Sequence, residues 1–252
     1  MESPQLVDHV IAALFGLLLP LAAFARGRSA LDPADFDASQ RVRFAWSTSV
    51  SLWLMAGGVA LAWTRGDRTL AELGLGPLAP PGTALAALLV GVALALYALD
   101  CALRLGSAER RAETRRRWLR DTPFMPRSGR EYASFLVMAL SAGLCEEVVF
   151  RGYLIRYGLA LFEPTGLGPV LAVLAPALVF GVAHLYQGWS AVARIVVGGV
   201  LFGAAFLASG SLWLPIAAHA GIDAFGGLLG LSLLPRESGG GAATPDTAPT
   251  GS

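Results

Sequence analysis

Two neighbouring carboxylates and an arginine interrupt an apolar stretch in the second half of the chain. Glu146, Glu147 and Arg151 lie in CEEVVFRGYL, residues 145–154, and the 14 residues from Tyr132 to Cys145 carry no charge. Ionised side chains are costly within a membrane, so they usually face the interior of a helix bundle and mark function. On a helix, Glu147 and Arg151 share a face and can pair, whereas Glu146 lies about 100° away around the axis. This spacing leaves Glu146 free to act as a general base.

Two further pairs of side chains follow at helical spacing. Phe180 and His184 are four residues apart in FGVAH, and His219 and Asp223 are four residues apart in HAGID. The small residues around His219 allow neighbouring helices to approach closely. A carboxylate that takes a proton from water, together with donors that stabilise an oxyanion, can hydrolyse a carbonyl compound. The three groups therefore predict a hydrolytic site.

The same side chains leave other interpretations open. Imidazole and carboxylate groups also suit zinc and related divalent metals, so Glu146, His184, His219 and Asp223 are candidate metal ligands as well as candidate catalytic residues. Taken singly, a Glu–Arg pair is also typical of a structural lock, and a buried histidine is typical of a packing residue. Three such groups in succession favour a functional site over these simpler interpretations.

The composition indicates that helices embedded in lipid must position these groups. The chain of 252 residues is 55% hydrophobic and 15% charged, whereas soluble domains are about 25% charged. A membrane helix needs about 20 apolar residues and satisfies its own backbone, so we expect an all-α, polytopic transmembrane bundle of about seven to eight helices. Seven candidate spans cover residues 6–25, 44–64, 83–103, 132–161, 167–184, 189–208 and 212–234.

The distribution of arginine predicts the orientation of these spans. Eight arginines lie in the segment 107–130, which we expect to be a loop, and four lie in the first loop, whereas the second loop has two. Positive charge in short loops marks the cytoplasmic side. We therefore expect an integral protein of a bacterial cytoplasmic membrane with its N-terminus outside and with Asp8 at the interface. The net charge of +1 gives no reason to expect nucleic acid as a partner.

Polar groups at membrane depth are concentrated after residue 130, which divides the chain into three parts. We expect N-terminal transmembrane helices and an arginine-rich loop over 1–130, a catalytic helical core over 131–235, and a disordered Gly/Pro/Thr-rich tail over 236–252. The depths of two site residues conflict in this scheme. Glu146 lies about 24 Å from the inner end of its span, whereas His184 lies near the inner end of its own. They can meet only if a helix is tilted, broken or longer than assumed.

The motifs EEVVFR, FGVAH and HAGID, in this order, resemble those of the CPBP intramembrane proteases. That family includes the CAAX prenyl endopeptidases and the bacterial Abi proteins. The resemblance covers about residues 131–235. It implies that a glutamate activates water, that a histidine assists at the scissile carbonyl, and that a second pair lies on the oxyanion side. These roles fall on Glu146, His184, and His219 with Asp223, while Glu147, Arg151 and Phe180 are supporting residues.

One position departs from the best-studied branch of the family, which has Asn where this chain has Asp223. An amide donates a hydrogen bond, but an ionised carboxylate only accepts one. The departure puts the oxyanion role of Asp223 in doubt and favours either a metal or a protonated Asp.

The resemblance implies an intramembrane (metallo)endopeptidase that hydrolyses peptide bonds of membrane-associated substrates by means of glutamate- and histidine-activated water. A divalent metal such as zinc is the candidate cofactor, and the expected partners are the lipid bilayer and a membrane-anchored peptide or protein. Two alternatives are a non-catalytic scaffold or bacteriocin self-immunity protein of the same fold, and a proton or ion carrier that uses the groups as a relay. The polar groups gather at one place, which favours the enzyme over the carrier.

Overall fold

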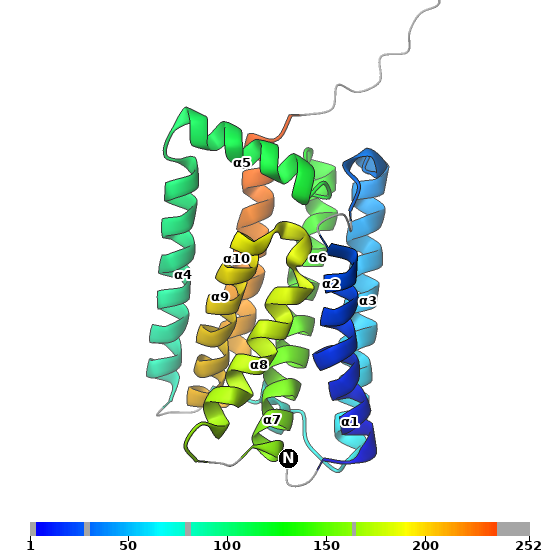
Figure 1. Cartoon of the computed structure of the whole chain (residues 1–252), viewed down its shortest axis with the longest axis vertical. Helices are drawn as coiled ribbons and strands as arrows, with labels where there is room; N and C mark the ends of the chain where they lie inside the picture. The colour runs from blue at the N-terminus through cyan, green and yellow to red at the C-terminus, as the bar shows by residue number, and fades with distance from the viewer. Residues whose placement is uncertain (1–3, 28–30, 79–81, 163–164, 236–252) are drawn as a thin grey trace, which may run out of the picture.

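The computed structural model describes residues 4–27, 31–78, 82–162 and 165–235. Within these residues the chain forms helices and no strand. Figure 1 shows the long helices running side by side along one axis. The predicted all-α transmembrane bundle is therefore confirmed. The predicted disordered tail, residues 236–252, lies outside the described residues.

The helices follow one another through short connections. Two of the long helical segments each contain a π-helical segment, and short π-helical or 3-10 segments also occur between helices; all of these are denoted η. In chain order they are α1 (Leu6–Ala13), η1 (Leu14–Leu18), α2 (Leu19–Arg26), η3 (Pro33–Asp35), α3 (Ala38–Arg65), η4 (Ala71–Leu75), α4 (Thr83–Leu105), α5 (Ala108–Asp121), α6 (Gly129–Glu146), η5 (Glu147–Leu154), α7 (Ile155–Leu161), α8 (Gly168–Ala183), η6 (Leu185–Gln187), α9 (Trp189–Ser209) and α10 (Trp213–Leu233).

The described residues contain six helical segments that are long and apolar enough to cross a membrane, which cover residues 6–26, 38–65, 83–105, 129–161, 189–209 and 213–233. The remaining predicted span is α8, which is apolar but only 16 residues long. At 1.5 Å per residue α8 covers about 24 Å, whereas the hydrocarbon core is about 30 Å thick. The C-terminal end of α8 therefore lies within the bundle, short of the end where α5 crosses it (Figure 1).

The long span over residues 129–161 is one continuous helical segment, but its hydrogen-bond pattern changes at the predicted site. α6 passes into the π-helical segment η5 at Glu147, and η5 includes Arg151. π-helical turns inside α-helices are frequently found at functional sites. The first predicted motif therefore coincides with a local change of helical geometry.

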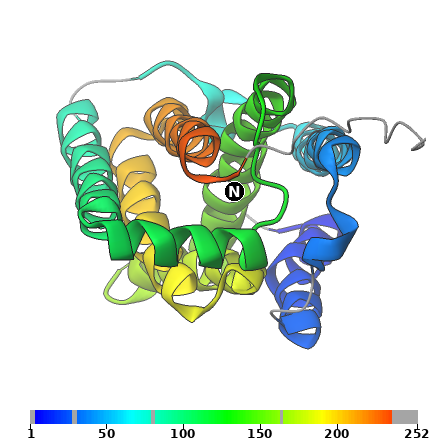
Figure 2. The same cartoon turned by 90° about the horizontal axis from the view of Figure 1, so that it is seen from above.

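Two elements differ from the sequence-based prediction. α3 begins at Ala38 and not at Phe44, because the Asp37 carboxylate accepts a hydrogen bond of 2.8 Å from the Gln40 backbone N–H and caps the helix. The segment 107–130, which we expected to be a loop, contains α5. The many arginines of this segment led us to expect a loop, but it forms an amphipathic helix. Figure 2 shows this helix lying across the end of the bundle.

Buried ion pairs connect the N-terminal helices to the later ones. Arg41 of α3 pairs with Glu131 of α6 at 2.6 Å, and both side chains are buried. Asp8 of α1 is also fully buried, and its carboxylate accepts hydrogen bonds of 2.9 Å from Arg68 and from the Tyr153 hydroxyl. The burial of Asp8 within the protein was not predicted from the sequence. Its charge is satisfied inside the protein, as the cost of burying an unpaired charge requires.

α6 and α10 approach each other closely where small residues face each other. A Cβ added to Gly143 would lie 2.7 Å from the backbone nitrogen of Ala220. The close approach predicted for the small residues around His219 is thus confirmed at Ala220. Glu146, Glu147 and His219 lie within one turn of this contact, so it sets the separation between them.

We expect Gly143→Ala to push α10 away from α6 and to lower the stability of the folded protein by about 1–3 kcal/mol, the usual cost of overpacking. The thermal unfolding midpoint of the purified protein in detergent measures this effect. Gly91→Ala is the matched control, because a Cβ on this α4 residue would have nothing within 4 Å. Equal midpoints for the two variants would show that the contact at Gly143 tolerates a methyl group.

Candidate active site

The Glu147 carboxylate joins three of the predicted site residues. Glu147 is fully buried, and its Oε1 lies 2.8 Å from Arg151 Nη1 and 2.8 Å from His219 Nδ1. An ionised carboxylate only accepts hydrogen bonds, so both nitrogens are donors and Nδ1 of His219 carries a proton. These bonds tie η5 to α10.

The Arg151 guanidinium lies among side chains of three helices. It is buried, and it stacks over the ring of Phe180 from α8 at 4.5 Å and lies 6.0 Å from the ring of Phe202 on α9. A Cβ on Gly199 of α9 would lie only 3.0 Å from Arg151 Nη2, so this glycine leaves room for the guanidinium. Aromatic faces attract a cation that has been removed from water. Phe180 therefore contacts the buried cation, and its supporting role stays a prediction.

The other ring nitrogen of His219 faces two further carboxylates. Nε2 lies 3.6 Å from Glu146 Oε2 and 3.7 Å from Asp223 Oδ2, longer than an ordinary hydrogen bond of about 2.7–3.2 Å. The exposed fraction of the side chain rises from 0% at Glu147 through 13% at His219 and 16% at Glu146 to 37% at Asp223. Glu146, His219 and Asp223 thus form an accessible layer above the buried Glu147–Arg151 pair.

His184 also packs against Phe180. Its ring centroid is 4.6 Å from that of Phe180, and the His219 centroid is 5.9 Å from the same ring. His184 Nδ1 lies 2.8 Å from the Phe180 carbonyl oxygen. A carbonyl only accepts, so Nδ1 carries the proton and, in the neutral ring, Nε2 is an acceptor.

The short α8 resolves the conflict of depth between Glu146 and His184. His184 directly follows α8, which ends within the bundle, and it is therefore recessed to the level of η5. Glu146, His219 and Asp223 interact electrostatically, and His184 interacts in the same way with His219 and Asp223. The structure thus brings the residues of the three predicted motifs into one region.

The comparisons with known proteins agree with this arrangement. Residues 128–225 match the family described as type II CAAX prenyl endopeptidase Rce1-like. The match covers less than half of the chain, and we call this segment the CAAX protease domain after the family that it resembles. Searches of curated proteins and of solved structures found no match to the chain. The matched segment lies mainly within the predicted catalytic core, 131–235, and contains all three motifs. The family match supports an endopeptidase, and the long apolar helices support its location in a membrane.

A divalent metal was predicted as a candidate cofactor of the domain, with Glu146, His184, His219 and Asp223 as ligands. Among the described residues, no group of three or more His, Cys, Asp or Glu side chains has the arrangement of a metal site. The divalent metal stays a prediction, and no step below uses one.

The sequence analysis missed Tyr186, which lies beside the site of the CAAX protease domain. Its ring centroid is 5.9 Å from that of His184, and its hydroxyl oxygen accepts a hydrogen bond of 3.0 Å from Gln187 Nε2. Tyr186 interacts electrostatically with Glu146 and Asp223. It lies in the 3-10 turn η6, so no helical period connects it with His184. The available signal was a tyrosine two residues after a motif histidine.

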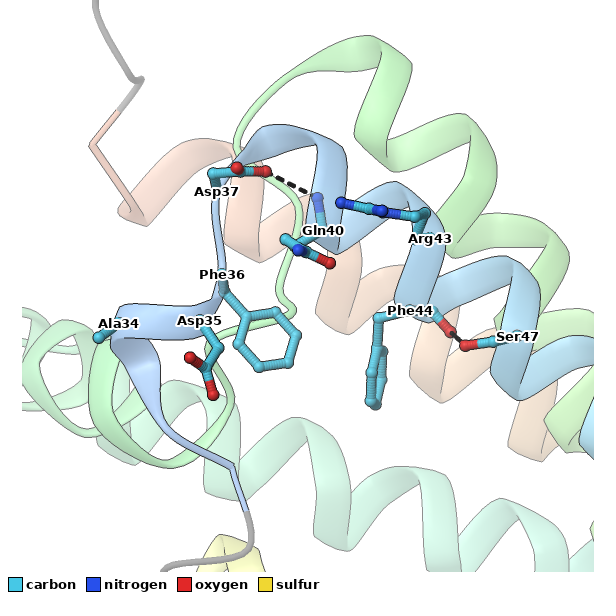
Figure 3. Close-up of a pocket in the computed structure, with 8 residues that line it drawn as sticks. All are labelled: Ala34, Asp35, Phe36, Asp37, Gln40, Arg43, Phe44 and Ser47. Carbon is cyan, nitrogen blue, oxygen red and sulfur yellow. Dashed lines mark hydrogen bonds between the residues drawn. The ribbon is translucent and has the colours of Figure 1, made fainter.

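A surface hollow lies away from the CAAX protease motifs. It lies around the beginning of α3 and is lined by Ala34, Asp35, Phe36, Asp37, Gln40, Arg43, Phe44 and Ser47 (Figure 3). Asp37 and Gln40, which form the cap of α3, lie at its edge, and none of the predicted site residues lines it. It is a feature of the helix end and carries none of the proposed chemistry.

We expect Glu147→Gln to destabilise the CAAX protease domain by about 3–5 kcal/mol, because it leaves the Arg151 guanidinium buried without its carboxylate. The yield of folded protein and the thermal unfolding midpoint in detergent measure this loss. The control is Glu113→Gln on α5, which removes a carboxylate from an exposed i,i+4 pair with Arg117. Exposed pairs contribute about 0–1 kcal/mol. A loss no larger in Glu147→Gln than in Glu113→Gln would contradict a structural role for the buried pair.

Proposed function

We propose that this protein is an intramembrane endopeptidase that hydrolyses a peptide bond of a membrane-anchored substrate with a water molecule activated by Glu146. The observation that carries the proposal is the accessible Glu146 carboxylate beside Nε2 of His219, which the buried Glu147 holds through Nδ1. A partly desolvated carboxylate next to an oriented imidazole suits general-base catalysis. The family match at residues 128–225 supports the same class of reaction.

Glu146 is the proposed general base. It takes a proton from water as the water oxygen bonds to the carbonyl carbon of the scissile peptide, and the carbonyl electrons move onto oxygen. Collapse of this tetrahedral intermediate breaks the C–N bond, and the proton held by Glu146 passes to the leaving nitrogen. The products are a carboxylic acid and an amine, which exchange a proton to give a carboxylate and an ammonium group, and Glu146 returns to its ionised form.

The two histidines have different proposed roles. Glu146, Glu147 and Asp223 surround His219, and Arg151 supplies only one positive charge, so a protonated His219 reduces the excess negative charge. His219 Nε2–H then donates to the oxyanion. His184 Nε2 is an acceptor, because Nδ1 donates to the Phe180 carbonyl, and it orients the attacking water.

Tyr186 is the proposed second donor to the oxyanion. Asp223 cannot donate while it is ionised. The Tyr186 hydroxyl oxygen accepts from Gln187 and retains its own O–H for donation. Asp223 then has the role of holding His219 in its protonated form, and Glu147 and Arg151 are positioning residues.

The proposed substrate is a peptide or protein anchored in the bilayer, because the site lies within a membrane-spanning bundle. We also propose that the end of the bundle that carries α5 faces the cytoplasm of a bacterial cell, which leaves the N-terminus outside. The arginines of α5 support this orientation.

Glu146→Gln should reduce cleavage of a membrane-anchored peptide library by about 10²–10⁴-fold, because Gln keeps the shape of the side chain and lacks its basicity. Cleavage is measured by mass spectrometry with purified protein in detergent, and the unfolding midpoint checks that the variant is folded. Glu113→Gln is the control, because this exposed α5 residue lies away from every proposed catalytic residue. Full cleavage by Glu146→Gln would refute its role as the base. A wild-type protein that cleaves no peptide would favour the scaffold alternative.

The metal prediction has its own test. The side-chain arrangement leads us to expect that a chelator leaves cleavage by the wild-type protein unchanged. The rate is measured before and after dialysis against the chelator, and again after zinc is added. Loss of cleavage that zinc restores would instead make Glu146, His184, His219 and Asp223 metal ligands or their neighbours, with water activated on the metal.

A further inference from the structure

An arginine-rich corner lies where the ends of α4 and α5 meet α9. Asp100 and Arg104 come from α4, Arg117 from α5 and Arg194 from α9. Asp100 Oδ2 lies 2.7 Å from Arg104 Nε and 3.5 Å from Arg194 Nε, so one carboxylate oxygen faces two guanidinium groups. Arg194 also interacts electrostatically with Arg117. Charged groups of three helices therefore gather at this corner.

The carboxylates at this corner do not balance its guanidinium groups. Asp100 faces Arg104 and Arg194, and Glu113 faces Arg116 at 2.8 Å and Arg117 at 2.7 Å. Four guanidinium groups thus face two carboxylates, which leaves two positive charges. Guanidinium groups bind phosphate oxygens through paired hydrogen bonds. The corner therefore has the charge and the donors of a phosphate site.

The position of α5 is fixed relative to the end of α4. Arg110 Nη1 donates to the Leu103 carbonyl at 3.0 Å, and Arg111 Nη1 donates to the Leu105 carbonyl at 2.8 Å. These bonds satisfy carbonyls at the C-terminal end of α4, where the helix itself offers no partner. The two arginines that hold α5 in place are distinct from those that surround Asp100.

The neighbouring surface identifies lipid as the source of the phosphate. The Arg194 side chain is 39% exposed, and Val197, one turn further along α9, is 49% exposed. Leu103, three residues after Asp100 on α4, is 55% exposed. Apolar side chains that face outward from membrane helices contact acyl chains, and a long arginine side chain among them extends to the interface. The headgroup of a lipid meets the guanidinium groups at that level.

We propose that this corner, formed by Asp100, Arg104, Arg117 and Arg194, binds the phosphate of an anionic phospholipid. Basic sites between membrane helices bind anionic headgroups in this way. The bound phosphate supplies the negative charge that the two carboxylates lack, and it joins α9 to α4 and α5. The proposal is independent of proteolysis, because it concerns only a charged surface of the bundle.

The test measures binding of phosphatidylglycerol to the purified full-length protein in detergent by native mass spectrometry. We expect wild-type protein to bind phosphatidylglycerol, and phosphatidylcholine and inorganic phosphate at the same concentrations to bind more weakly. Arg194→Gln should lower the affinity for phosphatidylglycerol about fivefold, which corresponds to about 1 kcal/mol per basic residue near an anionic lipid. Arg117→Gln should have a similar effect, and its exposed position on α5 makes it a variant that keeps the fold.

The control is Arg65→Gln, which removes one positive charge from the exposed C-terminal turn of α3 at the opposite end of the bundle. Its affinity for phosphatidylglycerol should equal that of the wild type. Unchanged affinity in both Arg194→Gln and Arg117→Gln would overturn the proposal. Equal losses in all three variants would overturn it as well, because they would indicate attraction by net charge alone. Inorganic phosphate that binds as tightly as the lipid would show a site for a soluble anion and not for a headgroup.

Discussion

The buried carboxylate of Glu147 is the interaction on which the rest of the site depends. Within a membrane protein a charge must be paired inside the bundle, because lipid offers it no hydrogen bond. Glu147 has two partners on the same oxygen, Arg151 from its own helical segment and His219 from α10. Each partner then restricts a further element. Arg151 lies against Phe180 of α8 and beside Gly199 of α9, and His219 turns Nε2 toward Glu146 and Asp223.

Because the site depends on the buried Glu147, aromatic side chains lie next to charged ones in this part of the core. The Phe180 ring is in contact with both Arg151 and His184, and its carbonyl oxygen lies within hydrogen-bond distance of His184 Nδ1. Phe180 therefore links the position of the Glu147–Arg151 ion pair to the position of His184. The catalytic layer proposed here is accessible, but its geometry is fixed by groups that lie beneath it and are closed to solvent. Preorganised groups of this kind need little rearrangement as charge develops.

The same physical rule distinguishes the interior of the bundle from its arginine-rich end. Inside, cations and carboxylates occur as close pairs, as in Arg41–Glu131 and Asp8–Arg68. At the end that carries α5, guanidinium groups outnumber the carboxylates that face them. An excess of charge is tolerable there because headgroups and water lie within reach of the side chains. The same excess of positive charge would cost too much free energy one or two helical turns deeper in the membrane.

The sequence by itself determined the membrane bundle, six of its seven spans within a few residues, and the identity of the residues that meet at the site. Apolar runs and i,i+4 spacing are local properties, and local properties can be read from the chain. The sequence did not predict α5, the burial of Asp8, the short reach of α8 or the approach of Tyr186 to His184. Each of these depends on contacts between residues far apart in the chain or on the tilt and end of a helix. The packing of α10 against α6 at Gly143 decided which nitrogen of His219 meets Glu147 and which faces Glu146. Only the tertiary structure could decide this, because the orientation of a side chain at a helix interface follows from three-dimensional contact and not from spacing in the sequence.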